Sequence, residues 1–140
     1  MHSEAELSRK LKRRGYEDDE VAQVVATCVR RGYLDDAAYA AALVQRRTSA
    51  RGASAMAAEL RAKGVGREAV AAALLPIDRE TEIDAAAGLF ARYVGAGSDL
   101  TERELLETVG ARLQRRGYGP QIIREACRRY LALSNMDGRP

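Results

Sequence analysis

The fold class of this chain is decided by residues 109–127, VGARLQRRGYGPQIIREAC. Their apolar residues recur every three or four positions on both sides of Gly117, which is the spacing of one face of an α-helix. Glycine commonly ends a helix, and Pro120 suits the first position of the next one. These residues therefore predict two helices joined by a glycine turn.

The same arrangement occurs twice more, around Gly15 and Gly64, so the three glycines are 49 and 53 residues apart. Apolar residues stand eight and four positions before each glycine and six positions after it: Leu7, Leu11, Val21, Met56, Leu60, Val70, Val109, Leu113 and Ile123. A longer helix is expected between successive pairs, so the natural unit is one long helix followed by a short pair. The chain is therefore expected to be all-α, an elongated array of tandem three-helix repeats of helix-turn-helix type.

About eight helices and no strand are expected, because an alternation of period two persists nowhere in the chain. Ser3 and Thr101 each begin a capping box, in which Ser or Thr is followed three residues later by Glu. The repeats are expected over residues 1–34, 35–76 and 77–133, with the leading helix absent from the first and a disordered tail over residues 134–140.

Composition argues against several classes of protein. The 140 residues are 46% apolar and 31% charged, which suffices for a buried core, and no segment approaches the ~20 apolar residues of a membrane span. His2 is the single histidine, and no Cys or His pair has metal-ligand spacing. Cys28 and Cys127 are expected to be free, buried thiols of a reducing compartment. We therefore expect no catalysis, metal, cofactor, small-molecule substrate or membrane contact.

Arginine supplies 20 of the 23 cationic residues, and the net charge is +3. This excess permits contact with nucleic acid or with an acidic protein, and its small size favours protein as the main partner. The candidate contact residues are Arg46, Arg47, Arg51, Arg61, Lys63, Arg115, Arg116, Arg124 and Arg128. Many of them stand near a helix end, where a cation also stabilises the last carbonyl groups, so capping and plain solvation remain alternative roles.

Four segments, in this order along the chain, resemble the RecX family of recombinase regulators. They are SEAELSRKL at residues 3–11, RGYLDDAAYA at 31–40, ELRAKGV at 59–65 and LQRRGY at 113–118. The most specific segment contains the family motif residues Arg31, Gly32, Tyr33, Leu34, Asp35, Asp36 and Tyr39. The resemblance covers residues 3–132. In the family a helix normally precedes the first segment, so we expect either a truncated start or an incomplete first repeat.

The resemblance implies a bacterial cytoplasmic regulator of the RecA recombinase. Proteins of this family consist of tandem three-helix repeats and bind along the groove of the RecA filament on DNA. There they restrain ATP hydrolysis, strand exchange and the coprotease activity that belongs to the SOS response. The implied partner is thus the RecA filament, in the regulation of recombination and DNA repair, with direct DNA contact as an additional interaction.

Residues of the motif also have structural interpretations. Asp35 and Asp36 follow a glycine turn at a helix start, where Asp side chains cap backbone amides, and contact with a partner is the alternative role. Tyr33 and Tyr39 are expected to pack in the core rather than to stack on bases.

An alternative function is that of a helix-turn-helix DNA-binding protein. Such a protein reads base edges with exposed Asn, Gln, Arg or Ser side chains of a recognition helix. The helix that begins at Pro120 offers Gln121, Arg124 and Arg128 for this role, which is a small set. A helical adaptor for peptides is a further alternative, but it needs a concave apolar strip that the sequence pattern does not locate.

Overall fold

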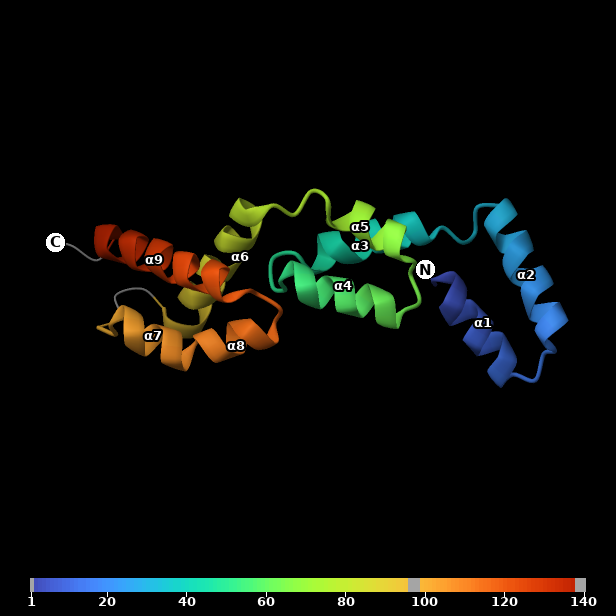
Figure 1. Cartoon of the computed structure of the whole chain (residues 1–140), viewed down its shortest axis with the longest axis horizontal. Coiled ribbons are helices and arrows are strands. Elements are labelled where there is room, and N and C mark those ends of the chain that lie inside the picture. The colour runs from blue at the N-terminus through green and yellow to red at the C-terminus, as the bar shows by residue number, and fades with distance from the viewer. Residues whose placement is uncertain (1, 96–98, 138–140) are drawn as a thin grey trace. The chain divides into compact units, whose positions relative to one another are not determined.

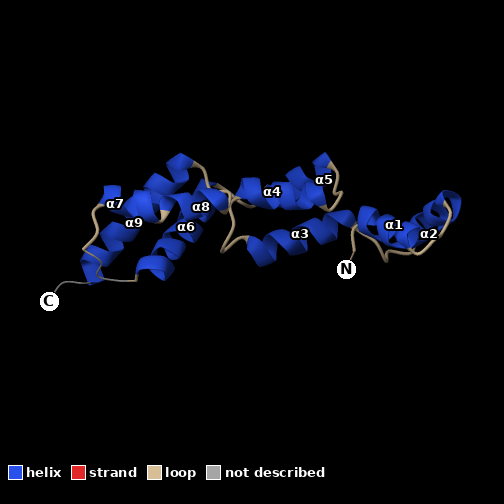
Figure 2. Cartoon of the chain, turned by 90° about the horizontal axis from the view of Figure 1, so that it is seen from below, coloured by secondary structure: helices blue, strands red, loops and turns tan. Residues whose placement is uncertain are grey.

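The computed structural model describes residues 2–95 and 99–137, the last two of these by backbone alone. Every regular element in this part of the chain is an α-helix (Figure 2). The helices are α1 (Glu4–Arg13), α2 (Asp18–Arg30), α3 (Asp36–Arg47), α4 (Ala53–Ala62), α5 (Arg67–Leu74), α6 (Arg79–Val94), α7 (Glu102–Thr108), α8 (Gly110–Arg115) and α9 (Pro120–Asp137) (Figure 1). The predicted all-helical fold class is confirmed.

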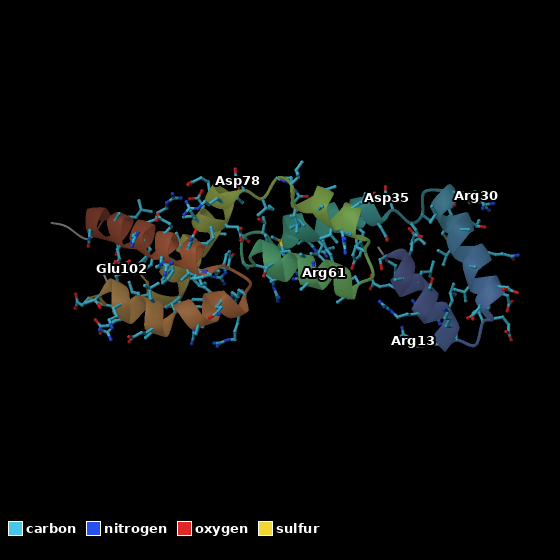
Figure 3. All side chains as sticks on the ribbon, in the orientation of Figure 1. Arg13, Arg30, Asp35, Arg61, Asp78 and Glu102 are labelled. Carbon is cyan, nitrogen blue, oxygen red and sulfur yellow. The ribbon has the colours of Figure 1, made fainter. Side chains whose placement is uncertain are left out.

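Helix starts use the local capping chemistry that the sequence predicts. The hydroxyl groups of Ser3 and Thr101 accept hydrogen bonds from the amides of Glu6 and Glu104, and each Glu side chain accepts from the capping residue's amide in return. Asp78, at the start of α6, accepts from an amide in the same way (Figure 3). Both predicted capping boxes are therefore confirmed, and the hydrogen bond from the Thr101 amide lowers the pKa of Glu104.

The glycine turns are also formed as predicted. Gly15, Gly64 and Gly117 have φ values of 95°, 83° and 95°, a left-handed conformation that side chains with a Cβ rarely adopt. The residue after each glycine donates its amide to the carbonyl group five positions earlier, as Tyr118 does to Leu113 at 3.2 Å. This bond is the hallmark of the Schellman motif, which satisfies carbonyl groups at the helix end.

One predicted helix is divided in two, so the described residues form nine helices rather than eight. The helix expected between Thr101 and Gly117 bends at Val109. The Thr108 hydroxyl donates to the carbonyl oxygen of Glu104 at 2.8 Å, and a threonine bonded back to its own helix favours such a bend. Gly110 follows directly and has low helix propensity.

Helix α9 continues to Asp137, whereas the sequence predicted a disordered tail from residue 134. Between Pro120 and Gly138 the sequence has neither glycine nor proline, and nothing therefore breaks the helix. The side chains of Leu131 and Ser134 are half-buried, which supports this last part of α9. Residues 138–140 of the expected tail lie outside the described residues.

The chain divides into two compact units, whose boundaries differ from those of the expected repeats. The first unit contains residues 1–45 and 57–75, and the second contains residues 46–56 and 76–140. Residues 46–56 comprise the end of α3, the loop after it and the first turn of α4. They therefore belong to the same unit as the whole expected third repeat.

The second unit has a continuous apolar core between α6, α7, α8 and α9 (Figure 1). Its buried residues are Ile83, Ala86, Ala87, Leu89, Phe90, Leu105, Val109, Leu113, Tyr118, Ile123, Ala126, Cys127 and Tyr130. The rings of Phe90 and Tyr130 stack with their centroids 6.0 Å apart. Three core positions predicted from the repeat, Val109, Leu113 and Ile123, lie in this cluster.

The first two helices are much less buried. Helix α1 has no fully buried residue and α2 has only Val21, while Leu7 and Leu11 are half-buried. We expected Val24 and Cys28 to face the core, but Val24 is 43% exposed and Cys28 is half-buried. The exposure of Val24 and the partial exposure of Cys28 arise because α1 and α2 pack chiefly on each other. Two helices alone cannot enclose an apolar face. Both cysteines are free, as predicted, although only Cys127 is fully buried.

Candidate functional site

A recurrent set of hydrogen bonds joins helix starts to glycine turns. In the first unit, the Ser3 hydroxyl donates to the carbonyl oxygen of Lys63, and the Glu4 amide donates to the Asp36 carboxylate at 3.0 Å. A Cβ atom placed on Gly64 would collide with that of Ala5, so the start of α1 lies directly against the turn between α4 and α5.

The second unit contains the same set. The Gly52 amide donates to the carbonyl oxygen of Arg116 at 2.8 Å, and the Ala53 amide donates to the Glu82 carboxylate at 3.0 Å. A Cβ atom on Gly117 would collide with Ala55 at the start of α4.

Three of the four corresponding positions in these two junctions keep the spacing of the sequence repeat, whereas the acceptor Glu82 stands 46 residues after Asp36. The donors Gly52 and Ala53 stand 49 residues after Ser3 and Glu4, and the acceptor Arg116 stands 53 residues after Lys63. The repeat in the sequence is thus also, within each unit, a repeat of contacts between a helix start and a glycine turn.

The residues of the family motif have separable structural roles. Asp35 accepts from the Ala38 amide at 3.1 Å at the start of α3, so its capping role is confirmed (Figure 3). Asp36 binds the amide of Glu4 instead and holds α1 against α3. Tyr39 is buried, as expected, but Tyr33 is 69% exposed, and the expectation that it packs is wrong.

Leu34 explains the exposure of Tyr33. The chain turns at Gly32, where φ is 75°, and the next two amides both donate to the carbonyl oxygen of Cys28. Leu34 then occupies the core side of this turn with 6% exposure, which directs Tyr33 towards solvent. Arg31 is exposed on the same turn.

The nine predicted contact residues differ in how they are engaged. In the first unit, Arg61 is exposed on α4, and the Lys63 ammonium lies 3.7 Å from a Glu6 carboxylate oxygen (Figure 3). In the second unit, Arg46 is exposed and Arg47 is half-buried at the end of α3.

On α9, Arg128 is engaged by two carboxylates. Its guanidinium lies 3.2 Å from Glu102 and 3.4 Å from Glu125, whereas Arg124 is exposed and has no such partner among residues 2–95 and 99–135. The neighbouring Arg129 binds Glu80 and Asp84 and was not among the predicted residues. Arg128 is therefore already paired within its own unit, which weakens its candidacy as a partner contact.

Three of the predicted arginines meet in one place. A hollow of about 420 Å³ in the second unit is lined by Arg51, Tyr93, Arg112, Arg115 and Arg116, and we call it the arginine hollow. Arg51 comes from the loop between α3 and α4, Tyr93 from α6, and the other three from α8 and its C-terminal cap. Three segments distant in the sequence thus supply one basic site.

Tyr93 and the backbone position two of these guanidinium groups, those of Arg112 and Arg116. The guanidinium carbons of Arg112 and Arg116 lie 5.0 and 5.8 Å from the centre of the Tyr93 ring, within the range of cation–π attraction. Arg116 also donates to the carbonyl oxygen of Ala50 at 3.1 Å and accepts from the Gly52 amide at 2.8 Å. The backbone on both sides of Arg51 is therefore fixed to Arg116.

The arginine hollow carries positive charge that its own unit does not neutralise. Among residues 2–95 and 99–135, its four arginines form no ion pair, whereas Arg103, Arg128 and Arg129 of the same unit all do. Like charges four positions apart on a helix, such as Arg112 and Arg116, are destabilising by a few tenths of a kcal/mol. The arrangement concentrates a positive potential that suits an anionic partner.

Sequence reasoning missed Arg112 and Tyr93. Arg112 had a usable signal, because it stands four positions before Arg116 and therefore shares its helix face. Tyr93 had none, since its place beneath α8 depends on how α6 packs. The adjacent Tyr118 is a core residue, and burial, with a contribution from Glu82, raises the pKa of its hydroxyl to about 12.

Two other kinds of site were sought in the described part of the chain. No group of three or more His, Cys, Asp or Glu side chains there could hold a metal ion. None of the helices described is both long and apolar enough to cross a membrane.

In each unit a helix start packs on a glycine turn in the same way. This recurrence is typical of the class of proteins built from tandem helical repeats. Two family models match the chain: the first three-helix domain of RecX over residues 1–28, and the second three-helix domain of RecX over residues 35–74. The chain belongs to the RecX family, as the following relatives show.

Several proteins named regulatory protein RecX are similar along most of this chain. The one from Amycolatopsis mediterranei is 33% identical over 141 residues, which cover 96% of this chain and 80% of the relative. The relative from Mycobacteroides abscessus is 38% identical, and the match covers 91% of this chain and 64% of the relative. The relative from Stenotrophomonas maltophilia is 35% identical, and the match covers 91% of this chain and 77% of the relative.

A solved structure agrees on the fold. The crystal structure of a regulatory protein RecX matches 87% of this chain and 62% of its own chain with a TM-score of 0.76. At 23% sequence identity this match shows a common fold. The resemblance that the sequence motifs carried is thereby confirmed at the level of family and fold.

Proposed function

We propose that this chain binds the RecA recombinase filament on DNA and inhibits its ATP hydrolysis, strand exchange and coprotease activity. Membership of the RecX family carries this proposal, because the relatives are regulatory proteins and the sequence resemblance implies RecA as their target. The chain would act in the bacterial cytoplasm, in the control of recombination, DNA repair and the SOS response.

The site supports binding as the mode of action. The arginine hollow offers four cations to an anionic partner, two of them held by Tyr93, and a filament on DNA presents phosphate charge along its whole length. We further propose that residues 1–34, 35–76 and 77–133 act as the repeats through which the chain follows the filament. Within each unit a helix start packs on a glycine turn in the same way, at Gly64 and at Gly117, which supports repeats of one kind.

The alternative of a sequence-reading helix-turn-helix protein is less well supported. Of the three exposed side chains that α9 offered for base contacts, Arg128 is bound to Glu102 and Glu125. A recognition helix needs free side chains at its groove-facing positions. We therefore keep RecA regulation as the proposed function.

ATP hydrolysis by RecA on single-stranded DNA tests the proposal. We expect the rate to fall several-fold as the chain approaches stoichiometry with RecA, while the chain alone hydrolyses no ATP. Excess single-stranded DNA serves as the control, since inhibition that disappears on adding it would come from sequestration of DNA. A hydrolysis rate that stays constant in excess chain would contradict the proposal.

A further inference from the structure

We propose that the arginine hollow binds the sugar-phosphate backbone of a DNA strand without regard to its bases. The inference rests on the proposed function, because that function brings the chain into contact with DNA. It also goes further, because it assigns Arg51, Arg112, Arg115 and Arg116 to phosphate groups and gives Tyr93 the role of a positioning residue.

The first argument is the unneutralised charge of the hollow. Three other arginines of the second unit, Arg103, Arg128 and Arg129, find carboxylates, and Arg129 lies 2.5 and 3.0 Å from Asp84 and Glu80. Arg79, Arg92 and Arg124 form no ion pair among the described residues, but they are single exposed cations rather than a cluster. The four arginines of the hollow have no such partners in the described part of the chain. Guanidinium groups bind phosphate through two parallel N–H bonds, so this set has the chemistry for a polyanion.

The second argument is that two of the four guanidinium groups, those of Arg112 and Arg116, are held in place before any ligand binds. Tyr93 lies within 5.8 Å of two guanidinium groups, and Arg116 secures the backbone on both sides of Arg51. A side chain that is already positioned loses less conformational entropy on binding than a free one. The hollow therefore has the preorganisation of a binding site rather than the freedom of a solvated helix face.

The third argument separates DNA from an acidic protein. Protein interfaces take much of their affinity from apolar and aromatic anchors in closed pockets, whereas four of the five residues that line this hollow are arginines. The one aromatic ring, Tyr93, is already engaged by Arg112 and Arg116. A nucleic-acid strand supplies regularly spaced charge and needs no apolar pocket, so it fits the hollow better.

The test uses the complete chain and a fluorescent single-stranded thymidine 20-mer, with affinity measured by anisotropy over a salt series. Four phosphate contacts predict a loss of affinity of about 50-fold between 50 and 200 mM salt. The double variant Arg112→Gln with Arg115→Gln should lose only about 7-fold over the same range, because two contacts remain. Neither side chain makes a hydrogen bond in the described structure, so circular dichroism should stay unchanged.

The matched control is the double variant Arg79→Gln with Arg92→Gln. Both residues are exposed in the second unit, neither lines the hollow, and the change in net charge is the same. This control should keep the salt dependence of the parent. Equal salt dependence in both double variants would overturn the proposal, because binding would then follow net charge alone.

Competitors identify the ligand class. An unlabelled adenosine 20-mer should displace the thymidine strand as well as an unlabelled thymidine 20-mer does, since no base is read. Displacement by polyglutamate at the same charge concentration would overturn the proposal in favour of an acidic protein segment. Displacement by pyrophosphate at similar concentration would overturn it in favour of a small polyphosphate.

The inhibition of RecA is measured on the same variants, so the two proposals can fail separately. If the Arg112→Gln, Arg115→Gln variant binds the strand more weakly, the site is supported. If the parent chain then leaves RecA activity unchanged, the proposed function is contradicted while the site stands. The opposite result is also possible: the parent chain inhibits RecA fully, but the two substitutions do not change strand binding. In that case the site is overturned and the proposed function stands.

Discussion

Replacing Gly117 with alanine is expected to destabilise the second unit by about 3 kcal/mol. The glycine has a φ of 95°, a left-handed conformation that costs an L-residue about 1–2 kcal/mol. An added Cβ would also lie 2.6 Å from the backbone nitrogen of Ala55, and relieving such overpacking costs about 1–3 kcal/mol. The slowest amides of α6 and α9 should then exchange with solvent on the order of 100-fold faster.

Gly15 supplies the matched control for this substitution. It stands in the same tetrapeptide, Arg-Arg-Gly-Tyr, and has the same φ of 95°, but no atom lies within 4 Å of its Cβ position. Gly15→Ala should therefore cost only the backbone term, about 1–2 kcal/mol, measured on the amides of α1 and α2. Equal costs at both glycines would mean that the junction at Gly117 adds no stability.

Replacing Phe90 with alanine should destabilise the second unit by about 3–5 kcal/mol. Its side chain is fully buried between α6 and α9 and stacks on Tyr130, so truncation leaves a cavity as well as losing buried apolar area. A thermal melt followed by circular dichroism should show the second unit unfolding at least 10 °C lower, at roughly 4–8 °C for each kcal/mol.

Leu11→Ala in α1 is the comparison for Phe90→Ala. Leu11 is half-buried in a helix without any fully buried residue, so its truncation leaves little cavity and should cost about 1 kcal/mol. A loss for Leu11→Ala as large as for Phe90→Ala would show that a further surface covers α1 in solution.

Helix ends were predictable from the sequence because their causes are local. Gly15, Gly64 and Gly117 end helices through their own backbone freedom, and Ser3 and Thr101 start them through bonds to residues three positions away. The bend at Val109 and the continuation of α9 past Leu133 were missed. Both depend on the balance between helix propensity and packing, which a sequence pattern describes poorly.

Long-range contacts were beyond prediction from one sequence. From the sequence, Asp36 was expected to cap its own helix. In the structure its carboxylate accepts a hydrogen bond from the Glu4 amide, 32 positions earlier. Arg128 was a candidate contact residue, and its ion pair with Glu102 joins residues 26 positions apart, although its second partner, Glu125, stands only three positions earlier. In each case the sequence indicated a charged group at a helix, and only packing decided what it binds.

The arginine hollow was predictable in part. Arg51, Arg115 and Arg116 were identified individually because each stands near a helix end in a cationic sequence. That they meet depends on the bond between the Gly52 amide and the Arg116 carbonyl group, which no local pattern specifies. Tyr93 joins them from α6 through the core packing of the second unit.

Co-sedimentation with RecA filaments on DNA tests most directly whether this chain is a filament-binding regulator. The measurement is made at 200 mM salt, where binding to naked DNA should be about 50-fold weaker than at 50 mM. We predict that the chain sediments with the filaments to a fixed ratio of chain to RecA and stays in solution with naked DNA. Recovery of the chain in the supernatant at saturating filament would contradict the proposed function.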